Sequence, residues 1–268
     1  MDSLDCGWNR VSSGCRVWDG VSPVNRAVND IIVAVLIIVI MVCGWKVLPM
    51  LYGYLHGSSQ YKTVSETYFH KGVVRFDRLQ KKYPDCKAWI YQKGTGINYP
   101  VMQRKGDNQY YLHHLYNGEY NFKGSIYIDK DNLHPFLDPV TILYGHRMRD
   151  RTMFWSIHQY ANKDYWKKHK TMTIYTKNQD YRVKIFAMFY LESNDKAYQN
   201  QNIQGYEDRE KYLLMVKKRS ILHTKVKVSP SDPLVLLSTC QEASGTHRIA
   251  VFGKLVPLKY TKKERKKG

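Results

Sequence analysis

The stretch LVLLSTCQEASGTHRIAVFGKLV, residues 234–256, has the pattern of two β-strands joined by a short polar loop. Each half is rich in branched apolar residues, and the loop between them consists of small and polar ones. Such a pair predicts a hairpin that places Cys240 at the end of one strand and Arg248 at the start of the next. Ser238 shares a strand face with Cys240 under the two-residue repeat of a strand, so this face turns polar toward its rim.

Six further runs of the same kind precede this hairpin and are separated by clusters of Gly, Asn, Asp and Pro. They cover residues 88–92, 97–103, 125–129, 141–146, 171–177 and 181–190. Eight strands in all favour a closed barrel or a sandwich. Two helices are expected among them, over 153–160 and 207–222, and the second has the acidic start and basic end that suit the helix dipole.

An apolar segment, Ile31–Leu55, lies ahead of the strands and contains a single charged residue, Lys46. Its length can cross a hydrocarbon core of about 30 Å as a helix. Because the segment is apolar all round, a membrane span is favoured over a buried amphipathic helix. No small-x-small cleavage site follows, which disfavours a removed signal peptide. The arginines before the span predict a cytoplasmic N-terminus and a main body outside the membrane.

The chain therefore divides into five expected parts. These are an N-terminal cytoplasmic segment (1–30), a transmembrane signal-anchor helix (31–55), a linker with an N-terminal helix (56–83), a main domain (84–258) and a basic tail (259–268). Within the third part, helical spacing runs from Tyr61 to Tyr83, interrupted at Gly72 and stopped by Pro84. The tail is expected to be a solvated charge run, with contact to anionic polymer or lipid as the alternative.

Forty-two Lys and Arg against twenty-three Asp and Glu give a net charge of +19. Such a charge attracts any polyanion, whether nucleic acid, anionic lipid or an acidic wall polymer, and does not choose among them. The five cysteines are odd in number, with no C-x-x-C pair and no His at ligand spacing. A zinc site or disulfide framework is thus disfavoured. We expect no metal ligands and no cofactor; no acidic cluster requires a calcium site, but the sequence leaves metal dependence open.

A free cysteine is most often a small buried hydrophobe, but the surroundings of Cys240 point to chemistry. Arg248 across a short loop would favour thiolate over thiol and would offer donors to a developing oxyanion. His146, at another strand end, can exchange protons near neutrality, as acyl transfer by a cysteine requires. Spacing alone leaves His113, His114 and His247 open for the same role.

These residues resemble the sortase signature of L-x-T-C, a downstream arginine and a strand-end histidine, here Leu237–Cys240, Arg248 and Tyr144–His146. The surrounding sequence is similar to class B sortases in particular. The matching runs are INYPVMQ (97–103), DNQYYL (107–112), GSIYID (124–129), TILYGHRMRDRTMF (141–154) and the helical segment 207–222. The resemblance covers roughly residues 61–257.

The resemblance implies a mainly β fold, an eight-stranded barrel with an N-terminal helical extension and a helix before the cysteine strand. It implies a membrane-anchored cysteine transpeptidase that cleaves a C-terminal sorting signal after Thr through a thioacyl intermediate and joins the protein to a cell-wall or pilin amine. Cys240 would be the nucleophile, His146 the acid for the leaving amine, and Arg248 the group that binds substrate and oxyanion. The implied partners are surface proteins with a sorting signal, the amine acceptor and the membrane, with no nucleic acid.

The resemblance also implies a substrate groove. Its residues would be Asn98, Met102, Tyr144, Ser193, Tyr198, Ser238 and Thr239. Aromatic and thioether side chains are more often core residues, which is the alternative for Tyr144 and Met102. The chain departs from the family pattern at Leu236, where many sortases have threonine, and at Gln241, where class B members often have an acid.

Two other functions remain open on the sequence. The same thioacyl intermediate resolved by water would make the chain a cysteine protease. A non-enzymatic, anchored protein could instead use the +19 charge to hold an acidic polymer, in which case Cys240 would be dispensable and binding would weaken with salt.

Overall fold

The computed structural model describes residues 23–200, 203–240 and 247–259, and for residues 23–26 and Cys240 it describes the backbone alone. The expected tail, apart from its first residue, and most of the expected cytoplasmic segment lie outside this range, as does Gln241. The chain separates into two compact units, residues 1–50 and 51–268, and the second contains all the strands.

The expected transmembrane segment lies within one long helix, α1 (Pro23–Tyr68). Within the described residues this is the one helix long and apolar enough to cross a membrane, and the apolar window is not buried by the protein. The helix also continues through residues 56–60, which the sequence assigned to a linker. The reason is packing, because a Cβ at Gly57 would approach Lys123 Cδ to 2.9 Å, so the helix needs glycine where it touches the loop that carries Lys123.

The helix expected over Tyr61–Tyr83 is two helical pieces around a tight hairpin. Helix α1 ends at Tyr68, the strands β1 (Phe69–His70) and β2 (Val73–Val74) pair with each other, and α2 (Phe76–Lys82) follows. Gly72, the expected interruption, lies in the hairpin turn with a φ of 82°, a conformation that glycine adopts without strain.

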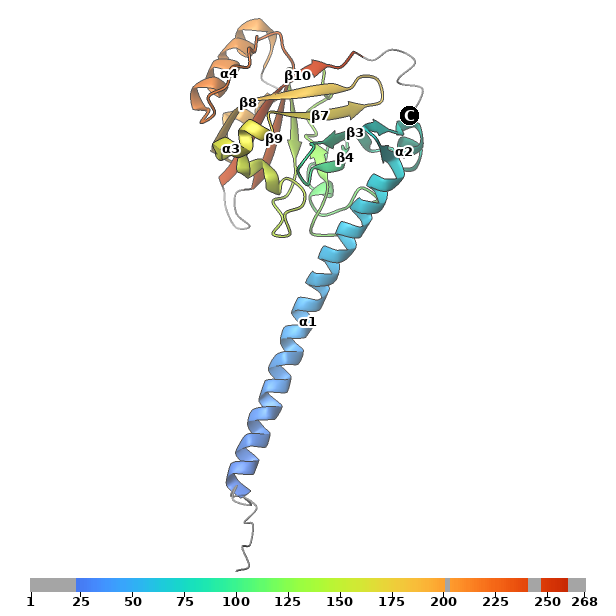
Figure 1. Cartoon of the computed structure of the whole chain (residues 1–268), viewed down its shortest axis with the longest axis vertical. Helices are drawn as coiled ribbons and strands as arrows, with labels where there is room; N and C mark the ends of the chain where they lie inside the picture. The colour runs from blue at the N-terminus through green and yellow to red at the C-terminus, as the bar shows by residue number, and fades with distance from the viewer. Residues whose placement is uncertain (1–22, 201–202, 241–246, 260–268) are drawn as a thin grey trace, which may run out of the picture. The chain divides into compact units, whose positions relative to one another are not determined.

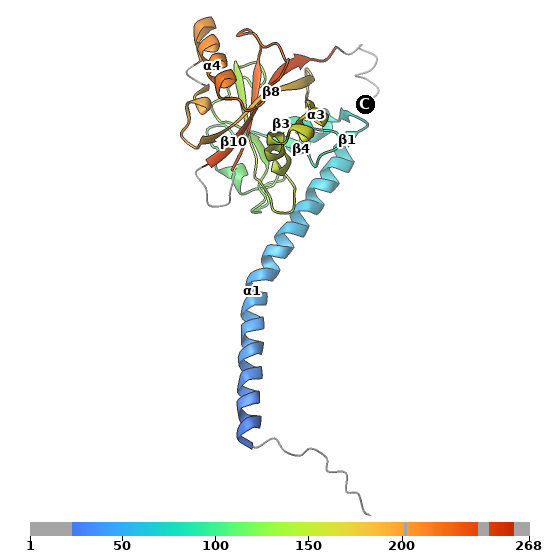
Figure 2. The same cartoon turned by 60° about the vertical axis from the view of Figure 1, so that its left-hand side comes forward.

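Eight strands form the closed barrel, as predicted (Figures 1 and 2). They are β3 (Cys86–Tyr91), β4 (Asn98–Met102), β5 (Ile126–Ile128), β6 (Val140–Tyr144), β7 (Thr171–Thr176), β8 (Tyr181–Glu192), β9 (Leu234–Cys240) and β10 (His247–Pro257). Their order around the barrel is β10-β8-β7-β3-β4-β5-β6-β9. Most pairs are antiparallel, but β4 with β5 and β6 with β9 are parallel.

The connections carry short helices and one longer one. The helix expected over 153–160 is the 3-10 helix η2 (Trp155–Ala161) followed by α3 (Lys163–Lys168). Single turns η1 (Tyr110–Leu112) and η3 (Lys196–Tyr198) lie before β5 and after β8. The helix expected over 207–222 is α4 (Gly205–Arg219), with acidic residues in its first turn and basic ones in its last.

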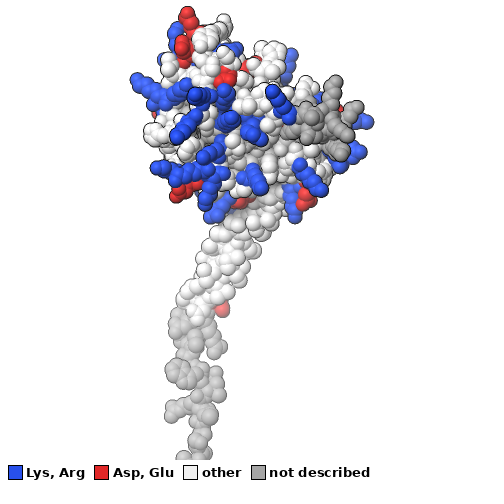
Figure 3. Space-filling model, turned by 45° about the horizontal axis from the view of Figure 1, so that its top comes forward, with Lys and Arg blue, Asp and Glu red and all other residues white. Residues whose placement is uncertain are grey.

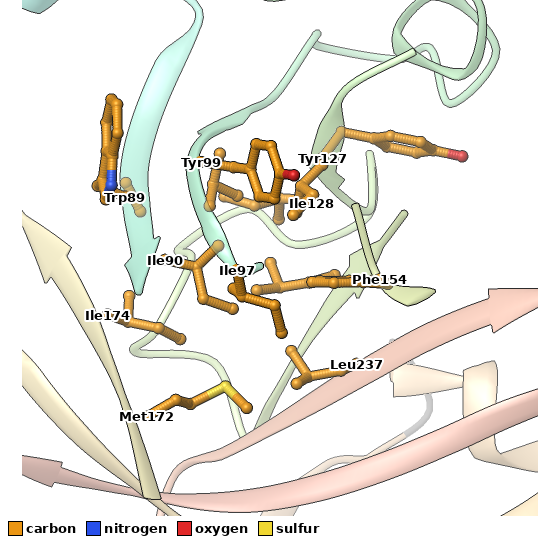
Figure 4. Close-up of a cluster of buried hydrophobic side chains, with 14 of the residues drawn as sticks. Trp89, Ile90, Ile97, Tyr99, Tyr127, Ile128, Phe154, Met172, Ile174 and Leu237 are labelled. Atoms are coloured by element: carbon orange, nitrogen blue, oxygen red, sulfur yellow. The ribbon is translucent and has the colours of Figure 1, made fainter. Parts of the chain in front are cut away.

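Two apolar clusters hold the domain together. The first fills the barrel and includes Ile90, Phe154 and Leu237, which have no solvent-accessible surface (Figure 4). The second lies outside the barrel, where Tyr212 and other residues of α4 pack against Phe252 and its neighbours. Leu236, which stands where many sortases have threonine, is fully buried in this outer cluster, so the difference from threonine alters the packing of the cluster.

Candidate active site

Three neighbouring strand ends bring the predicted catalytic positions into one row. Strands β6 and β9 run parallel with Tyr144 opposite Ser238, and the Gly145 amide extends the ladder by donating to the Ser238 carbonyl at 3.1 Å. His146 and Cys240 each follow two residues beyond that last pair. On the other side of β9, Arg248 of β10 is the direct partner of Cys240. The backbone thus orders the three positions as histidine, cysteine, arginine across adjacent strands.

The row lies on the outer face of the barrel, beyond the part that α4 covers. Alternate positions of β9, at Leu234 and Leu236, belong to the outer apolar cluster, and the same two-residue repeat leads to Ser238 and Cys240. On β10 the corresponding positions pass from Phe252 to Arg248. One strand face is therefore apolar under the helix and polar past it, as the sequence predicted for Ser238.

Hydrogen bonds and ring contacts join the polar end of this face. The Tyr198 hydroxyl lies 2.6 Å from Ser238 Oγ, and the Arg248 guanidinium lies 5.8 Å from the centre of the Tyr198 ring. The Tyr144 ring is 5.9 Å from that of Tyr198, and its hydroxyl donates to Asp129 at 2.9 Å. Burial, and then the Asp129 carboxylate, raise the pKa of Tyr144, so it remains a neutral donor. We call Tyr144, Tyr198, Ser238 and Arg248 the tyrosine cluster.

Tyr198 is positioned from outside the cluster. It ends η3, whose first turn is capped by Asp195, since that carboxylate accepts from the Ala197 amide at 2.9 Å. Arg219, the last residue of α4, donates to both oxygens of Asp195 at 2.7 Å each. Such paired hydrogen bonds fix orientation as well as distance. Helix α4 therefore both covers the apolar part of the face and holds Tyr198 over its polar part.

His146 is half-buried, with its ring fixed by the backbone. Its Nε2 lies 2.7 Å from the Leu112 carbonyl oxygen, and because a carbonyl only accepts, Nε2 carries a hydrogen. In the neutral ring Nδ1 is then the nitrogen that can take up a proton. Burial lowers the pKa of His146, and the nearby His113, 6.5 Å away between ring centres, lowers it further. The neutral ring therefore dominates near neutral pH, and the imidazolium is the minor form.

A buried lysine ties down the loop that follows His146. Lys123 is almost fully enclosed, with a side-chain exposure of 1%, and its ammonium group bonds to the Asp150 carboxylate and to Thr152 Oγ1 at 2.9 Å. It also donates to Ser58 of α1 at 2.8 Å. We call these four residues the lysine clamp. It ties helix α1 to the loop that begins at His146.

The hairpin formed by this loop also closes on the histidine itself. The Phe154 amide donates to the His146 carbonyl at 2.9 Å, and Arg147 pairs with Met153. Gly145 is required just before the histidine, because a Cβ there would lie 2.7 Å from the Phe154 ring. The backbone of His146 is thus held on both sides.

The other predicted substrate positions have environments of their own. Asn98 accepts from the Trp89 indole at 2.7 Å and donates to Ser65 of α1 at 2.6 Å. Met102 has no accessible surface. Thr239 is buried on the opposite strand face from Ser238, and Ser193 is exposed in the turn after β8. Contact of these four with a substrate remains a prediction.

The competing histidines have different positions. His113 neighbours His146, while His114 is stacked on Tyr110 with 4.0 Å between ring centres. His247 is exposed and is the strand partner of Glu192. His146 and His247 both lie at the ends of strands that pair with the cysteine strand, but His146 is half-buried and held by the Leu112 carbonyl, whereas His247 is exposed.

Sequence analysis missed three groups that shape the site. These are Asp129, the Asp195–Arg219 pair and the lysine clamp. Asp129 and Asp150 lie within runs quoted for the resemblance, but no periodic pattern marks them, and each acts through a side chain distant in the sequence. The run NFKGS, residues 121–125, places Lys123 beside an aromatic residue in a segment that the structure shows to be largely buried. Nothing in this run indicates that Asp150 is the partner of the lysine.

The lowered pKa of His146 predicts a pH effect of its neighbour. His113→Asn removes a positive charge that opposes protonation of His146, so the pKa of His146 should rise. Coulomb's law across 6.5 Å in a water-like medium gives an upward shift of about half a pH unit, which salt should erase. The profile of kcat/KM against pH measures it. His134→Asn, at an exposed site elsewhere, is the control, and a downward shift at low salt would contradict the assignment.

Comparison with known proteins adds the following. A model of the Sortase domain family matches residues 91–256. Sortase B of Listeria monocytogenes is 36% identical over 229 residues, covering 81% of this chain and 92% of that protein. The structure of a Staphylococcus aureus sortase B–substrate complex superposes with a TM-score of 0.68 at 28% identity, covering 76% of this chain and 98% of that one. The structure of a sortase B complexed with triglycine superposes with a TM-score of 0.64 at 32% identity, covering 69% of this chain and 86% of that one.

Proposed function

Because the chain belongs to the class B sortases, which are cysteine transpeptidases of the bacterial cell surface, we propose that it cleaves a C-terminal sorting signal after threonine and transfers the protein to a cell-wall or pilin amine. The observation that carries this proposal is the row of His146, Cys240 and Arg248 positions on β6, β9 and β10. The solved sortase B structures with a substrate and with triglycine support a peptide donor and an amine acceptor.

In the first half of the reaction, the Cys240 thiolate attacks the threonine carbonyl carbon and a carbon–sulfur bond forms. The carbonyl oxygen becomes an oxyanion and accepts hydrogen bonds from the Arg248 guanidinium. When the tetrahedral intermediate collapses, the carbon–nitrogen bond breaks and the His146 imidazolium gives its proton to the leaving amine. A thioester on Cys240 and a neutral imidazole remain.

In the second half, the acceptor amine attacks the thioester and the neutral His146 takes its proton. The carbon–sulfur bond breaks, and Cys240 leaves as a thiolate, which restores the starting pair. Because burial lowers the pKa of His146 while a free thiol has a pKa of about 8.5, thiolate and imidazolium coexist in a small fraction of molecules. Turnover should therefore peak between the two values and fall on both sides.

The tyrosine cluster forms one side of the proposed peptide site. Ser238 and Tyr198 hold each other by a hydrogen bond, and Arg248 lies beside the Tyr198 ring. Tyr144, fixed by Asp129, offers an aromatic surface between the histidine strand and Tyr198. Asn98, Met102, Ser193 and Thr239 are proposed from the resemblance alone.

We further propose that α1 anchors the enzyme as a single-pass helix with the barrel on the outer side of the membrane. Its exposed apolar residues and its length support this arrangement. The arginine excess before the span supports a cytoplasmic N-terminus.

Transpeptidation and hydrolysis differ in the group that resolves the thioester. The full-length chain is incubated with peptides carrying motifs that resemble L-P-x-T-G or N-P-x-T-N, with and without triglycine, and analysed by mass spectrometry. We expect a threonine-ended adduct on Cys240 and, with triglycine, a ligated product. Hydrolysed product alone at saturating triglycine would favour the protease, and no adduct with any peptide on folded enzyme would contradict the proposal. Family membership already argues against a purely non-enzymatic protein.

A further inference from the structure

A lysine-lined groove lies away from the catalytic row. It has a volume of about 880 Å³ and lies between α3, the starts of β7 and β8, the end of β10 and the segment after α4. Six lysines line it, namely Lys167, Lys170, Lys184, Lys225, Lys227 and Lys254. No acidic side chain in the described part of the chain belongs to its lining. We call it the lysine groove.

Few of these charges are neutralised by the protein. Within the described ranges, acidic partners reach Lys167, from Asp164 at 3.4 Å, and Lys254, from Asp232 at 2.7 Å. Lys184 and Lys254 are also direct partners across β8 and β10. Like charges in directly opposed strand positions destabilise a sheet, so the fold tolerates a concentration of charge here that stability alone disfavours.

The lysine groove is separate from the peptide site. Arg248 is the second residue of β10, whereas Lys254 follows six positions later on the same strand. At about 3.4 Å per residue the two lie about 20 Å apart along the strand. A short peptide in the catalytic row therefore does not reach the groove, and the proposed transpeptidation does not use these lysines.

The shape and the residue type of the groove indicate its ligand. A flat bilayer surface cannot enter a concave groove, whereas a flexible chain can. The planar fork of arginine binds carboxylates and phosphates in one fixed geometry, whereas lysine binds phosphate as a compact point charge, which suits a flexible series of equivalent phosphates. Val226 supplies apolar surface between the charges, and Trp166 and His223 are the aromatic rings of the lining, which leaves little for stacking of successive bases.

We propose that the lysine groove binds a linear cell-surface polymer of repeating phosphate groups. The polymer would hold the barrel beside the anionic material of its surroundings, independently of the sorting signal. The large positive charge of the molecule supports binding of such a polymer, because it attracts polyanions. The face shown in Figure 3 carries far more Lys and Arg than acidic residues.

The test measures binding of fluorescently labelled linear polyphosphate to the full-length chain in neutral detergent by anisotropy. The variant is Lys184→Gln/Lys225→Gln/Lys227→Gln. The matched control is Lys93→Gln/Lys105→Gln/Lys218→Gln, which removes the same number of exposed charges outside the groove.

We expect the groove variant to bind at least tenfold more weakly and the control variant within about twofold of the unaltered chain. By analogy with single-stranded nucleic acid, the slope of log K against log salt should flatten by about 2 for the three lysines lost. Lys225→Gln/Lys227→Gln, which leaves the sheet intact, should change binding in the same direction.

Equal losses in the two triple variants would overturn the proposal, because net charge alone would then explain binding. The proposal would also be overturned if phosphatidylglycerol vesicles or single-stranded DNA displaced the labelled polyphosphate more effectively, per phosphate, than unlabelled polyphosphate does. Peptide cleavage without polymer should be unchanged in the groove variant. That readout confirms folding and separates this proposal from the proposed transpeptidation.

Discussion

Cys240→Ala is expected to abolish thioester formation and to lower product formation by at least about 10⁴-fold, since it removes the proposed nucleophile that carries the acyl chain. The unfolding midpoint should change little, because Cys240 is the last residue of β9. Mass spectrometry of the intact variant after incubation with the sorting-signal peptides measures the first effect, and urea unfolding measures the second.

The other described cysteines provide the controls. Cys86 is fully buried in the barrel, and burial raises the pKa of its thiol to about 12, so it holds almost no thiolate at neutral pH. Cys43 lies in the exposed apolar part of α1. Cys43→Ala should therefore retain full activity. A peptide adduct that persists in Cys240→Ala would contradict the assignment of the nucleophile.

Asp150→Asn is expected to cost about 3 kcal/mol of stability, because it leaves the enclosed Lys123 ammonium without its carboxylate. Lys123→Met should cost less, since the Asp150 side chain is 28% exposed and can be hydrated when its partner is lost. Adding Lys123→Met to Asp150→Asn should then restore part of the lost stability. Urea unfolding of the three variants measures these differences.

The pH dependence gives a second readout of the lysine clamp. Burial lowers the pKa of Lys123, with Asp150 opposing the shift, so without Asp150 the folded state binds the proton more weakly than the unfolded state. The unfolding free energy of Asp150→Asn should then rise with pH up to the pKa of a free lysine, about 10.4. A double variant less stable than either single one would contradict the clamp, and Asp131→Asn, at an exposed ion pair, is the control.

The strands were predictable because their signal is local. Each apolar run between Gly, Asn, Asp and Pro clusters is one strand of the barrel, including both halves of the Cys240 hairpin. The strand order was not accessible from periodicity, since it depends on pairing between distant segments, and the resemblance implied an eight-stranded barrel without its order. The helix end at Tyr68 was missed because the spacing of apolar residues continues through the hairpin around Gly72.

The candidate site also has a part that the sequence predicts and a part that it does not. The position of Arg248 opposite Cys240 follows from a short hairpin, and the two-residue repeat gave the face of Ser238. The contact of Tyr198 with Ser238 depends on a single helical turn held by Asp195, and no sequence pattern predicts that turn. The lysine clamp could not be predicted either, because a lysine in a polar run is expected to be exposed unless the structure shows that it is enclosed.

The parallel pairing of β6 with β9 has a consequence for how the enzyme matures. These two strands are joined by most of the second half of the domain, so their contact closes a long loop and forms slowly relative to local hairpins. Cys240 and Arg248 meet early through their hairpin, whereas His146 joins them when the barrel closes. A newly made chain therefore carries Cys240 before His146, its proposed proton donor, is in place, and we expect acyl-transfer activity to arise together with the completed fold.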